Sequence, residues 1–282
     1  QTYNLTYNAS SGKWEATVTA PSKSSYSQPN HVLGGMIKAT DDAGNTTTVD
    51  QNHTTLGASL KIRVKEKTAP SITITAPSAG AYITTITPAI EFQVKDMDSG
   101  VNAGTIAVTV DGTAVSNITK TAIDGGYKCT CTSPTLKDGS HTISVKASDN
   151  DGNAAAAKTA TFTIDTVPPT LQITAPSNDL ITNQKAVTVT GKTDDATSKP
   201  VTVTVNGVAV TVGTNGTFTK EVTLAEGANT ITIVAKDKAG KTTTVTRRVT
   251  VNTSAPVIKS ITLSPNPVDC GKTFIIAVEI TD

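Results

Sequence analysis

Two short acidic stretches hold the residues of this sequence that are best suited to chemistry. The first gathers Asp149, Asp151 and Asn153 around one glycine, and the second places Asp96 and Asp98 two positions apart. Carboxylate and amide oxygens are the ligands that Ca²⁺ prefers, and the ion takes about six to eight of them. The sequence therefore offers these five residues as candidate calcium ligands.

The same stretches can also be interpreted as solvated turns. An Ala-x-Asp-x-x-Gly pattern occurs three times, with its aspartate at Asp41, Asp149 and Asp237. In such a turn the aspartate caps backbone N–H groups and the glycine supplies a positive φ. The segment around Asp149 lacks the spaced bidentate glutamate of an EF-hand loop, and the turn at 237–241 carries lysines in place of further oxygen ligands. The sequence favours turn capping and leaves calcium open.

Catalytic chemistry finds little support in the residue types present. The three histidines, His31, His53 and His141, have no partner at a motif spacing. A nucleophile would need an adjacent base, and neither a nucleophile elbow nor a glycine-rich phosphate loop nor a zinc spacing occurs. We therefore expect no enzymatic activity and no cofactor, apart from the open question of calcium.

The balance of charge and hydropathy excludes two further classes of partner. The chain has 24 Lys+Arg and 23 Asp+Glu, a net charge of +1, so no global field attracts nucleic acid or an anionic membrane. Apolar runs stay well below the roughly 18 residues that would span a bilayer. We expect neither nucleic-acid binding nor membrane insertion.

Three cysteines are too few for a disulfide scaffold. Cys129 and Cys131 lie two apart in a strand pattern, so both face the same side, and pairing within one strand is geometrically awkward. We expect these two to be small buried side chains and Cys270, which follows a turn, to be partly exposed.

The elements that would position all these residues repeat along the chain. A proline before an apolar run recurs at Pro70, Pro169 and Pro256, so the copies are 99 and then 87 residues apart. Each interval has the length of one compact domain. Because proline restricts the backbone, these segments are expected to be stiff linkers.

Alternation of apolar and polar residues within each interval predicts strands. Strong two-residue turn signals stand at Asp111-Gly112 and Asn206-Gly207, and Asn215-Gly216 predicts a further hairpin. About seven short strands per interval, with no helical periodicity, indicate a two-sheet antiparallel sandwich.

The Ala-x-Asp-x-x-Gly turn, the strand end Ile-Asp165-Thr and the following Pro-Pro with Ile-Thr-Ala-Pro-Ser resemble tandem bacterial immunoglobulin-like modules. Such modules occur in surface adhesins, in stalks of secreted enzymes and in tail proteins of phages and phage-like particles. The resemblance covers residues 1–282 and implies an all-β chain of tandem Ig-like antiparallel β-sandwiches in an elongated array. The antibody hallmarks of a cystine beside a tryptophan are missing.

The repeat divides the chain into two full units and two partial ones. Residues 68–166 and 167–253 are expected to be complete Ig-like domains, and residues 1–67 to be an incomplete unit without its opening strands. Residues 254–282 supply opening strands of a further unit. In this alignment Asp282 corresponds to Asp194 and Asp96, and Trp14 corresponds to core aromatic residues of the full units.

Two explanations of the partial units are open. A longer array can simply be cut between strands. Alternatively, residues 254–282 of one chain complete residues 1–67 of the next, by strand addition to an open sheet lined by Trp14, Ile37 and Leu60. Such a head-to-tail contact generates filaments when it does not close.

These features and the resemblance together indicate a non-enzymatic extracellular protein. The expected role is structural or adhesive: a spacer or filament-forming array on a bacterial surface, or on a phage tail or phage-like particle. One alternative is a module that binds a cell-surface glycan or protein, for which Tyr3, Tyr7 and Tyr26 are the hint. The other is an accessory stalk of a larger secreted enzyme.

Overall fold

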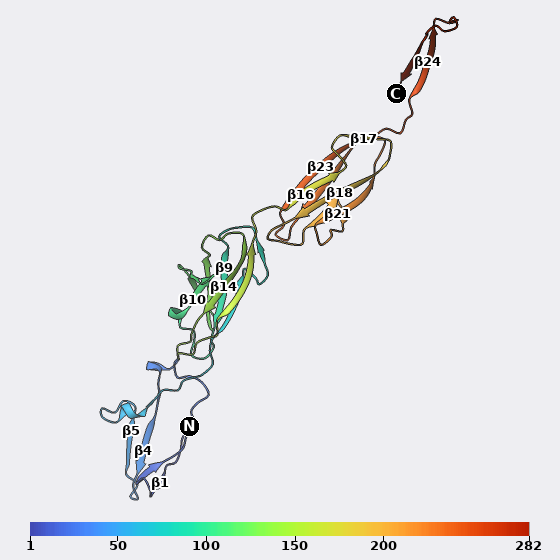
Figure 1. Ribbon diagram of the computed structural model, residues 1–282. Coiled ribbons are helices and arrows are strands. Elements are labelled where there is room, and N and C mark those ends of the chain that lie inside the picture. The colour runs from blue at the N-terminus through green and yellow to red at the C-terminus, as the bar shows by residue number, and fades with distance from the viewer. Residues whose placement is uncertain (282) are drawn as a thin grey trace. The chain divides into compact units, whose positions relative to one another are not determined.

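The computed structural model describes residues 1–281, and nearly all of its regular elements are strands (Figure 1). The chain forms two compact units, of which the first is Gln1–Ile164 and the second begins at Asp165. Each unit contains one complete two-sheet sandwich. The expectation of tandem Ig-like β-sandwiches is confirmed, and the predicted equivalence of Asp282 lies outside the described residues.

The sandwich of the first unit, which we call sandwich 1, consists of a four-stranded and a five-stranded sheet. The four-stranded sheet has the order β12 (Thr119–Ile123), β13 (Gly126–Thr132), β9 (Ala89–Lys95), β7 (Ser71–Ala76). The five-stranded sheet has the order β11 (Thr113–Ala114), β10 (Ala107–Val110), β14 (Gly139–Lys146), β15 (Lys158–Ile164), β8 (Tyr82–Ile83).

The core of sandwich 1 lies between these sheets and follows from strict alternation along the strands. In β9, Ile90, Phe92 and Val94 are fully buried while the residues between them reach the surface. Ile143 and Val145 of β14 belong to the same core on the opposite sheet and are equally buried. A period of two places one face of each strand inside, so the second sheet is needed to cover it.

The sandwich of the second unit, sandwich 2, repeats this plan. Its three-stranded sheet has the order β16 (Thr170–Ala175), β18 (Ala186–Asp194), β21 (Thr217–Thr223). Its five-stranded sheet has the order β17 (Leu180–Thr182), β23 (Thr242–Val251), β22 (Gly227–Lys236), β19 (Thr202–Val205), β20 (Val208–Val210). A separate core is built around Val189, Phe218, Ile231 and Ile233.

The opening strand of each sandwich is split between the two sheets, which the expectation of seven strands did not foresee. β7 pairs with β9, and after Pro77 the chain crosses over so that β8 pairs in parallel with β15. β16 and β17 do the same around Pro176. Proline has no N–H to donate to a ladder, so the pairing stops there and resumes on the other sheet.

Two of the three predicted hairpins are confirmed. Asp111-Gly112 joins β10 to β11 and Asn206-Gly207 joins β19 to β20, with φ between 48° and 81° at all four residues. The hairpin predicted at Asn215-Gly216 is wrong. It is a turn, but β20 pairs with β19 while β21 pairs with β18 in the other sheet, so the chain changes sheets at this point.

Residues 1–67 form three separate two-stranded sheets and no closed sandwich. Trp14, which corresponds in sequence to core aromatic residues of the full units, is 67 % exposed here. Ile37 is 44 % exposed, and Leu60 is half-buried. The pairs are β1 (Thr6–Asn8) with β2 (Lys13–Glu15), β3 (Leu33–Gly34) with β6 (Lys61–Ile62), and β4 (Met36–Thr40) with β5 (Thr46–Asp50), accompanied by the 3₁₀ turns η1 (Pro29–His31) and η2 (Gly57–Leu60).

Residues 254–281 form one antiparallel pair, β24 (Val257–Ser264) and β25 (Ile275–Thr281). Its apolar side chains are exposed on both strands, among them Ile261 at 60 % and Ile276 at 60 %. A two-stranded ribbon has no second sheet to cover such residues. Both this pair and residues 1–67 therefore present uncovered apolar strands.

The cysteines lie as the sequence predicts. Cys129 and Cys131 are buried on the inner face of β13, and Cys270 is exposed, all three as free thiols. Burial raises the pKa of the Cys129 and Cys131 thiols, because the charged thiolate is poorly solvated there.

Alkylation should therefore separate the three thiols. In the folded chain we expect iodoacetamide to modify Cys270, while Cys129 and Cys131 stay unmodified until the chain is unfolded in denaturant. Peptide mass spectrometry after a timed reaction provides the measurement, with the denatured chain as the fully reactive control. Equal reaction rates at all three positions in the folded chain would contradict the packing of β13.

Candidate functional site: two carboxylate clusters

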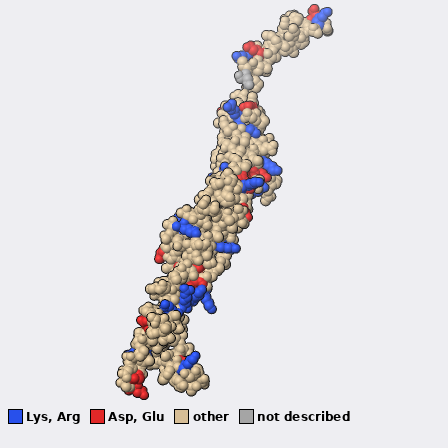
Figure 2. All heavy atoms as spheres, turned by 90° about the vertical axis from the view of Figure 1, so that its left-hand side faces the viewer, with Lys and Arg blue, Asp and Glu red and all other residues tan. Residues whose placement is uncertain are grey.

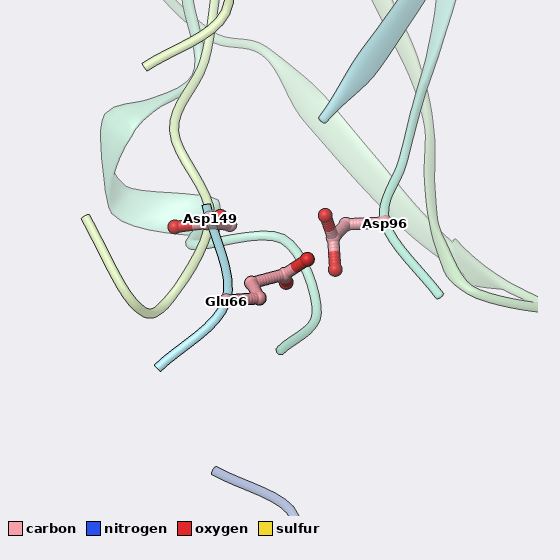
Figure 3. Close-up of side chains that lie close together, drawn as sticks. All are labelled: Glu66, Asp96 and Asp149. Atoms are coloured by element: carbon pink, nitrogen blue, oxygen red, sulfur yellow. The ribbon is translucent and has the colours of Figure 1, made fainter. Parts of the chain in front are cut away.

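The first candidate site is a group of three carboxylates in the first unit, which we call the Glu66 cluster. It consists of Glu66, Asp96 and Asp149, and one oxygen of each lies within 4.8 Å of the others. The side chains come from three separate segments (Figure 3): the stretch between β6 and β7, the end of β9, and the turn after β14. Asp96 and Asp149 are 8 % and 1 % exposed, and Glu66 is half-buried.

Strand periodicity explains why the two aspartates are buried. The inward face of β9 ends with Phe92 and Val94, and Asp96 is the next residue in that phase. In the same way Val145 and Ala147 are buried in the strand that leads to Asp149. A period of two thus carries each carboxylate to the rim of the core.

Backbone N–H groups hold one oxygen of each carboxylate in place. Asp149 Oδ1 accepts from the N–H of Asn153 at 2.7 Å, which confirms the predicted turn cap. Asp96 Oδ1 accepts from two N–H groups of its own loop, at 3.0 and 2.9 Å. Glu66 Oε1 accepts from the N–H of Ser99 at 2.9 Å, so the linker residue is tied to the loop that follows β9.

The other predicted ligands have different roles. Asp98 Oδ1 accepts from the backbone N–H of Ser24 at 2.9 Å, and Asp151 Oδ2 accepts from the N–H of Glu66 at 3.1 Å. Both therefore fasten residues 1–67 to sandwich 1. Asn153 donates its side-chain amide to the carbonyl of Glu66 and to Asp149 Oδ2, at 3.1 and 2.6 Å. Of the five predicted residues, the structure brings Asp96 and Asp149 into the cluster.

A second group of carboxylates, the Asp165 cluster, lies in the second unit. Asp165, Asp195 and Asp237 also have one oxygen each within 4.8 Å of the others, and they are 0 %, 5 % and 5 % exposed. Asp165 precedes β16, Asp195 follows β18 and Asp237 follows β22. Buried carboxylates this close together repel one another unless a positive charge or a proton compensates them.

The contacts of the Asp165 cluster leave one buried oxygen without a partner. Asp195 Oδ1 accepts from the N–H of Ser198 at 2.7 Å, and the Ser198 hydroxyl donates to Asp165 Oδ2. Asp237 Oδ1 caps its turn through the N–H of Lys241 at 2.8 Å. Asp237 Oδ2 is buried and has no hydrogen-bond partner.

The two clusters occupy matching positions in the two sandwiches. Glu66 lies four residues before Pro70, and Asp165 lies four residues before Pro169. In each sandwich a serine follows three residues after the second carboxylate, Asp96 or Asp195. The third carboxylate is in each case the aspartate of the Ala-x-Asp-x-x-Gly turn, which follows β14 or β22. The matched pairs are Glu66 with Asp165, Asp96 with Asp195, Ser99 with Ser198 and Asp149 with Asp237.

The alignment of Asp96 with Asp194 in the sequence is therefore off by one residue. The Asp194 side chain is 61 % exposed and pairs with Lys199 at 2.8 Å, whereas Asp195 is buried in the cluster. The burial pattern of β18 has its inward residues at odd positions, with Val189 and Thr193 among them, so the next inward residue is Asp195. The alternation of buried and exposed residues along β18 is therefore the signal that identifies Asp195.

The histidines are engaged in structural contacts. His141 Nδ1 lies 2.6 Å from Asp111 Oδ2 and its Nε2 lies 2.7 Å from the carbonyl oxygen of Lys137, so both ring nitrogens are occupied. Tyr26 and the ring of His31 stack at 4.1 Å. The exposed aromatic residues of the first unit are Tyr3, Tyr7 and Trp14, and the last two lie side by side at 5.6 Å.

One face of the molecule carries charges of both signs (Figure 2). On the face drawn in Figure 2, lysine and arginine are scattered among acidic residues, and most of the surface is neutral. Within residues 1–281 no helix has the length and hydropathy of a membrane-crossing segment.

Comparison with known proteins assigns family models to both sandwiches. Residues 75–166 match the bacterial Ig-like domain, and residues 169–253 match domain B of glucodextranase. Among solved structures, the fibronectin(III)-like modules of Clostridium thermocellum CbhA are similar at 20 % identity and a TM-score of 0.42, over 64 % of this chain and 94 % of that one.

Two curated proteins contain similar segments. Bacillopeptidase F of Bacillus subtilis is 31 % identical over 158 residues, which are 56 % of this chain and 11 % of the peptidase. Chitinase ChiA of Flavobacterium johnsoniae is 30 % identical over 205 residues, which are 66 % of this chain and 13 % of the chitinase. The chain thus spans about a tenth of the length of these relatives.

The pair formed by Asp111 and His141 should make the stability of sandwich 1 depend on pH. Partial burial disfavours the charged ring, but hydrogen bonds to Asp111 and the Lys137 carbonyl, together with the Asp111 charge, outweigh it and raise the pKa of His141 above 6.5. The charged ring is therefore favoured in the folded state. Its contribution is complete below about pH 6.5 and is lost as the pH rises through the higher folded pKa.

Removing the Asp111 charge tests this dependence. In Asp111→Asn the pKa of His141, followed by NMR of the ring protons, should fall, and the decline in unfolding free energy above neutral pH should flatten. Asp124→Asn, at an exposed turn of the other sheet, is the matched control and should leave both unchanged. An unchanged His141 titration in Asp111→Asn would refute the pairing.

Proposed function

Because the chain is built from tandem immunoglobulin-like modules, we propose that it is a non-catalytic spacer within a larger extracellular protein. As a spacer, the chain sets the distance between a functional domain of that protein and the part that attaches the protein to its surface. A bacterial surface is the proposed setting, with a phage-like particle as the second. A cell-surface glycan or protein ligand would add adhesion to the same role.

The observation that carries the proposal is the similarity of one chain to parts of two differently named enzymes. Bacillopeptidase F is named as a peptidase and ChiA as a chitinase, and each shares about a tenth of its length with this chain. A segment that serves proteins with two different reactions does not carry the chemistry of either. This supports an accessory role beside a catalytic domain.

The two sandwiches have the physical properties that a spacer needs. Each has its own core, built around Phe92 and Ile143 in one and around Phe218 and Ile233 in the other. Because the apolar residues of each sandwich pack within it, each can fold and bear load without the other. Length is then added one module at a time.

Single-molecule force spectroscopy tests this modular behaviour. We expect two independent unfolding events, each lengthening the chain on the order of 30 nm, because each sandwich has about 90 residues and an extended residue spans roughly 3.5 Å. Ile143→Ala should weaken one event and Ile233→Ala the other, since truncating a fully buried isoleucine costs about 2–5 kcal/mol.

Activity assays complete the test of the spacer role. The purified chain should hydrolyse neither protein nor chitin substrates above the rate of a heat-denatured sample. Turnover that survives purification, or a single cooperative unfolding event for both sandwiches, would contradict the proposed function.

A second candidate function is head-to-tail assembly, favoured by the uncovered apolar strands at 1–67 and 254–281. The occupant that we propose for the open sheets of residues 1–67 is the β24–β25 pair of a second copy of this chain. Trp14 and Met36 on one side and Ile261 and Ile276 on the other are all at least 60 % exposed. Joining them would bury both sets at once and repeat along a filament.

Sedimentation velocity over a concentration series decides this second function. We expect the sedimentation coefficient to rise with concentration and Ile276→Asp to abolish the rise, because the introduced charge would be buried in the contact. Val208→Asp, at an exposed apolar position of β20, is the control and should still assemble. A chain that remains monomeric throughout rules out self-completion.

A further inference from the structure

We propose that the Glu66 cluster and the Asp165 cluster are two equivalent binding sites for a hard divalent cation, best matched by Ca²⁺. Each site would hold the ion between the segment that leads into a sandwich and two loops of that sandwich. This assignment does not depend on the spacer role. It also changes the ligand set expected from the sequence. Glu66 replaces Asp98, Asp151 and Asn153 in the first site, and the second site, in the Asp165 cluster, is added.

The unpartnered groups at the clusters point to a missing ligand. Asp237 is 5 % exposed and its Oδ2 has no hydrogen-bond partner. One of the two Asp237 oxygens lies within 4.8 Å of an oxygen of Asp165 and of an oxygen of Asp195. Beside the Glu66 cluster, the Ser99 hydroxyl is likewise buried and unpartnered, and the backbone N–H of the same residue donates to Glu66 Oε1. A buried polar atom without a partner is costly, and a coordinated cation would satisfy it.

In Asp237 the turn cap uses one carboxylate oxygen and leaves the other for a cation. The N–H of Lys241 bonds Oδ1 of Asp237, and the N–H of Ser198 bonds Oδ1 of Asp195. These bonds fix the orientation of the carboxylates while the second oxygen of Asp237 stays uncommitted. The lysines of the turn at 237–241 made a calcium site look unfavourable in the sequence. They do not prevent cation binding, because the proposed ligands come from three separate segments and this turn supplies Asp237 alone.

The donor set selects the kind of ion. Both clusters consist of carboxylates with a serine beside them, and neither includes a histidine or cysteine. Oxygen ligands suit Ca²⁺ and Mg²⁺, whereas zinc and copper favour nitrogen and sulfur. Carboxylates from three segments form a site of adaptable geometry, which suits Ca²⁺ better than the strict octahedron of Mg²⁺, and water would complete the coordination shell.

Binding would fasten the lead segment of each sandwich. Glu66 and Asp165 precede the opening strands β7 and β16, while their partner carboxylates belong to the loops after β9 and β14 and after β18 and β22. Without a cation the negative carboxylates of a cluster repel one another. A bound cation is attracted by all three carboxylates and holds them together. The ion would therefore protect the lead segments from local opening.

Calorimetric titration of the chelator-treated full chain is the primary experiment. We expect two Ca²⁺ ions per chain, a higher Tm with Ca²⁺ than with chelator, and weaker responses to Mg²⁺ at equal concentration. Asp96→Asn and Asp195→Asn should each remove one ion, and together they should remove both, while the amide oxygen can still accept the capping N–H bonds. Absence of heat and of any Tm shift in the unaltered chain with both metals would overturn the proposal.

Matched variants separate the clusters from ordinary surface acids. Asp194→Asn changes the exposed neighbour of Asp195, and Asp98→Asn changes the predicted ligand that instead accepts from Ser24. Both should keep two ions per chain. Loss of an ion in either control would overturn the assigned ligand sets, and loss in Asp98→Asn alone would restore the set expected from the sequence. Circular dichroism in chelator confirms that each variant is folded before titration.

Discussion

The structure depends on one constraint, that each strand with an apolar face must have a second sheet to cover it. The sandwiches meet it with thin cores of β-branched residues and a few phenylalanines, such as Phe92 and Phe162 in sandwich 1. Where the second sheet is missing, as in residues 1–67 and in β24–β25, equivalent side chains are exposed. One rule thus accounts for the two closed sandwiches and for the two parts whose apolar strands stay exposed.

The same constraint creates the carboxylate clusters. Because side chains alternate, the inward phase of a strand continues into its loop and carries Asp149 and Asp195 to the rim of the core. The acidic residue of the lead segment, Glu66 or Asp165, then closes the group because the opening strand begins at the same rim. Charge is concentrated at this rim by the geometry of the sandwich, not by overall composition.

Local signals in the sequence predicted most of the fold. Alternation gave the strands, Asp111-Gly112 gave a hairpin, and the Ala-x-Asp-x-x-Gly pattern gave the capped turns. Contacts across sheets were harder, because nothing local says that the turn after β20 leads to the other sheet or that Glu66 meets Asp96. Two further comparisons would have identified the cluster residues in the sequence. One is the inward phase of the preceding strand, and the other is the number of residues to the linker proline.

Hydrophobic packing and the proposed cation binding would stabilise a module in different ways. Packing of residues such as Ile143 and Ile233 involves no ionised group, so the cores of the sandwiches do not require a bound cation. A carboxylate cluster is conditional, because its mutual repulsion becomes attraction only when the ion is present. A spacer built in this way would have permanent modules and lead segments whose stability follows the external concentration of the cation.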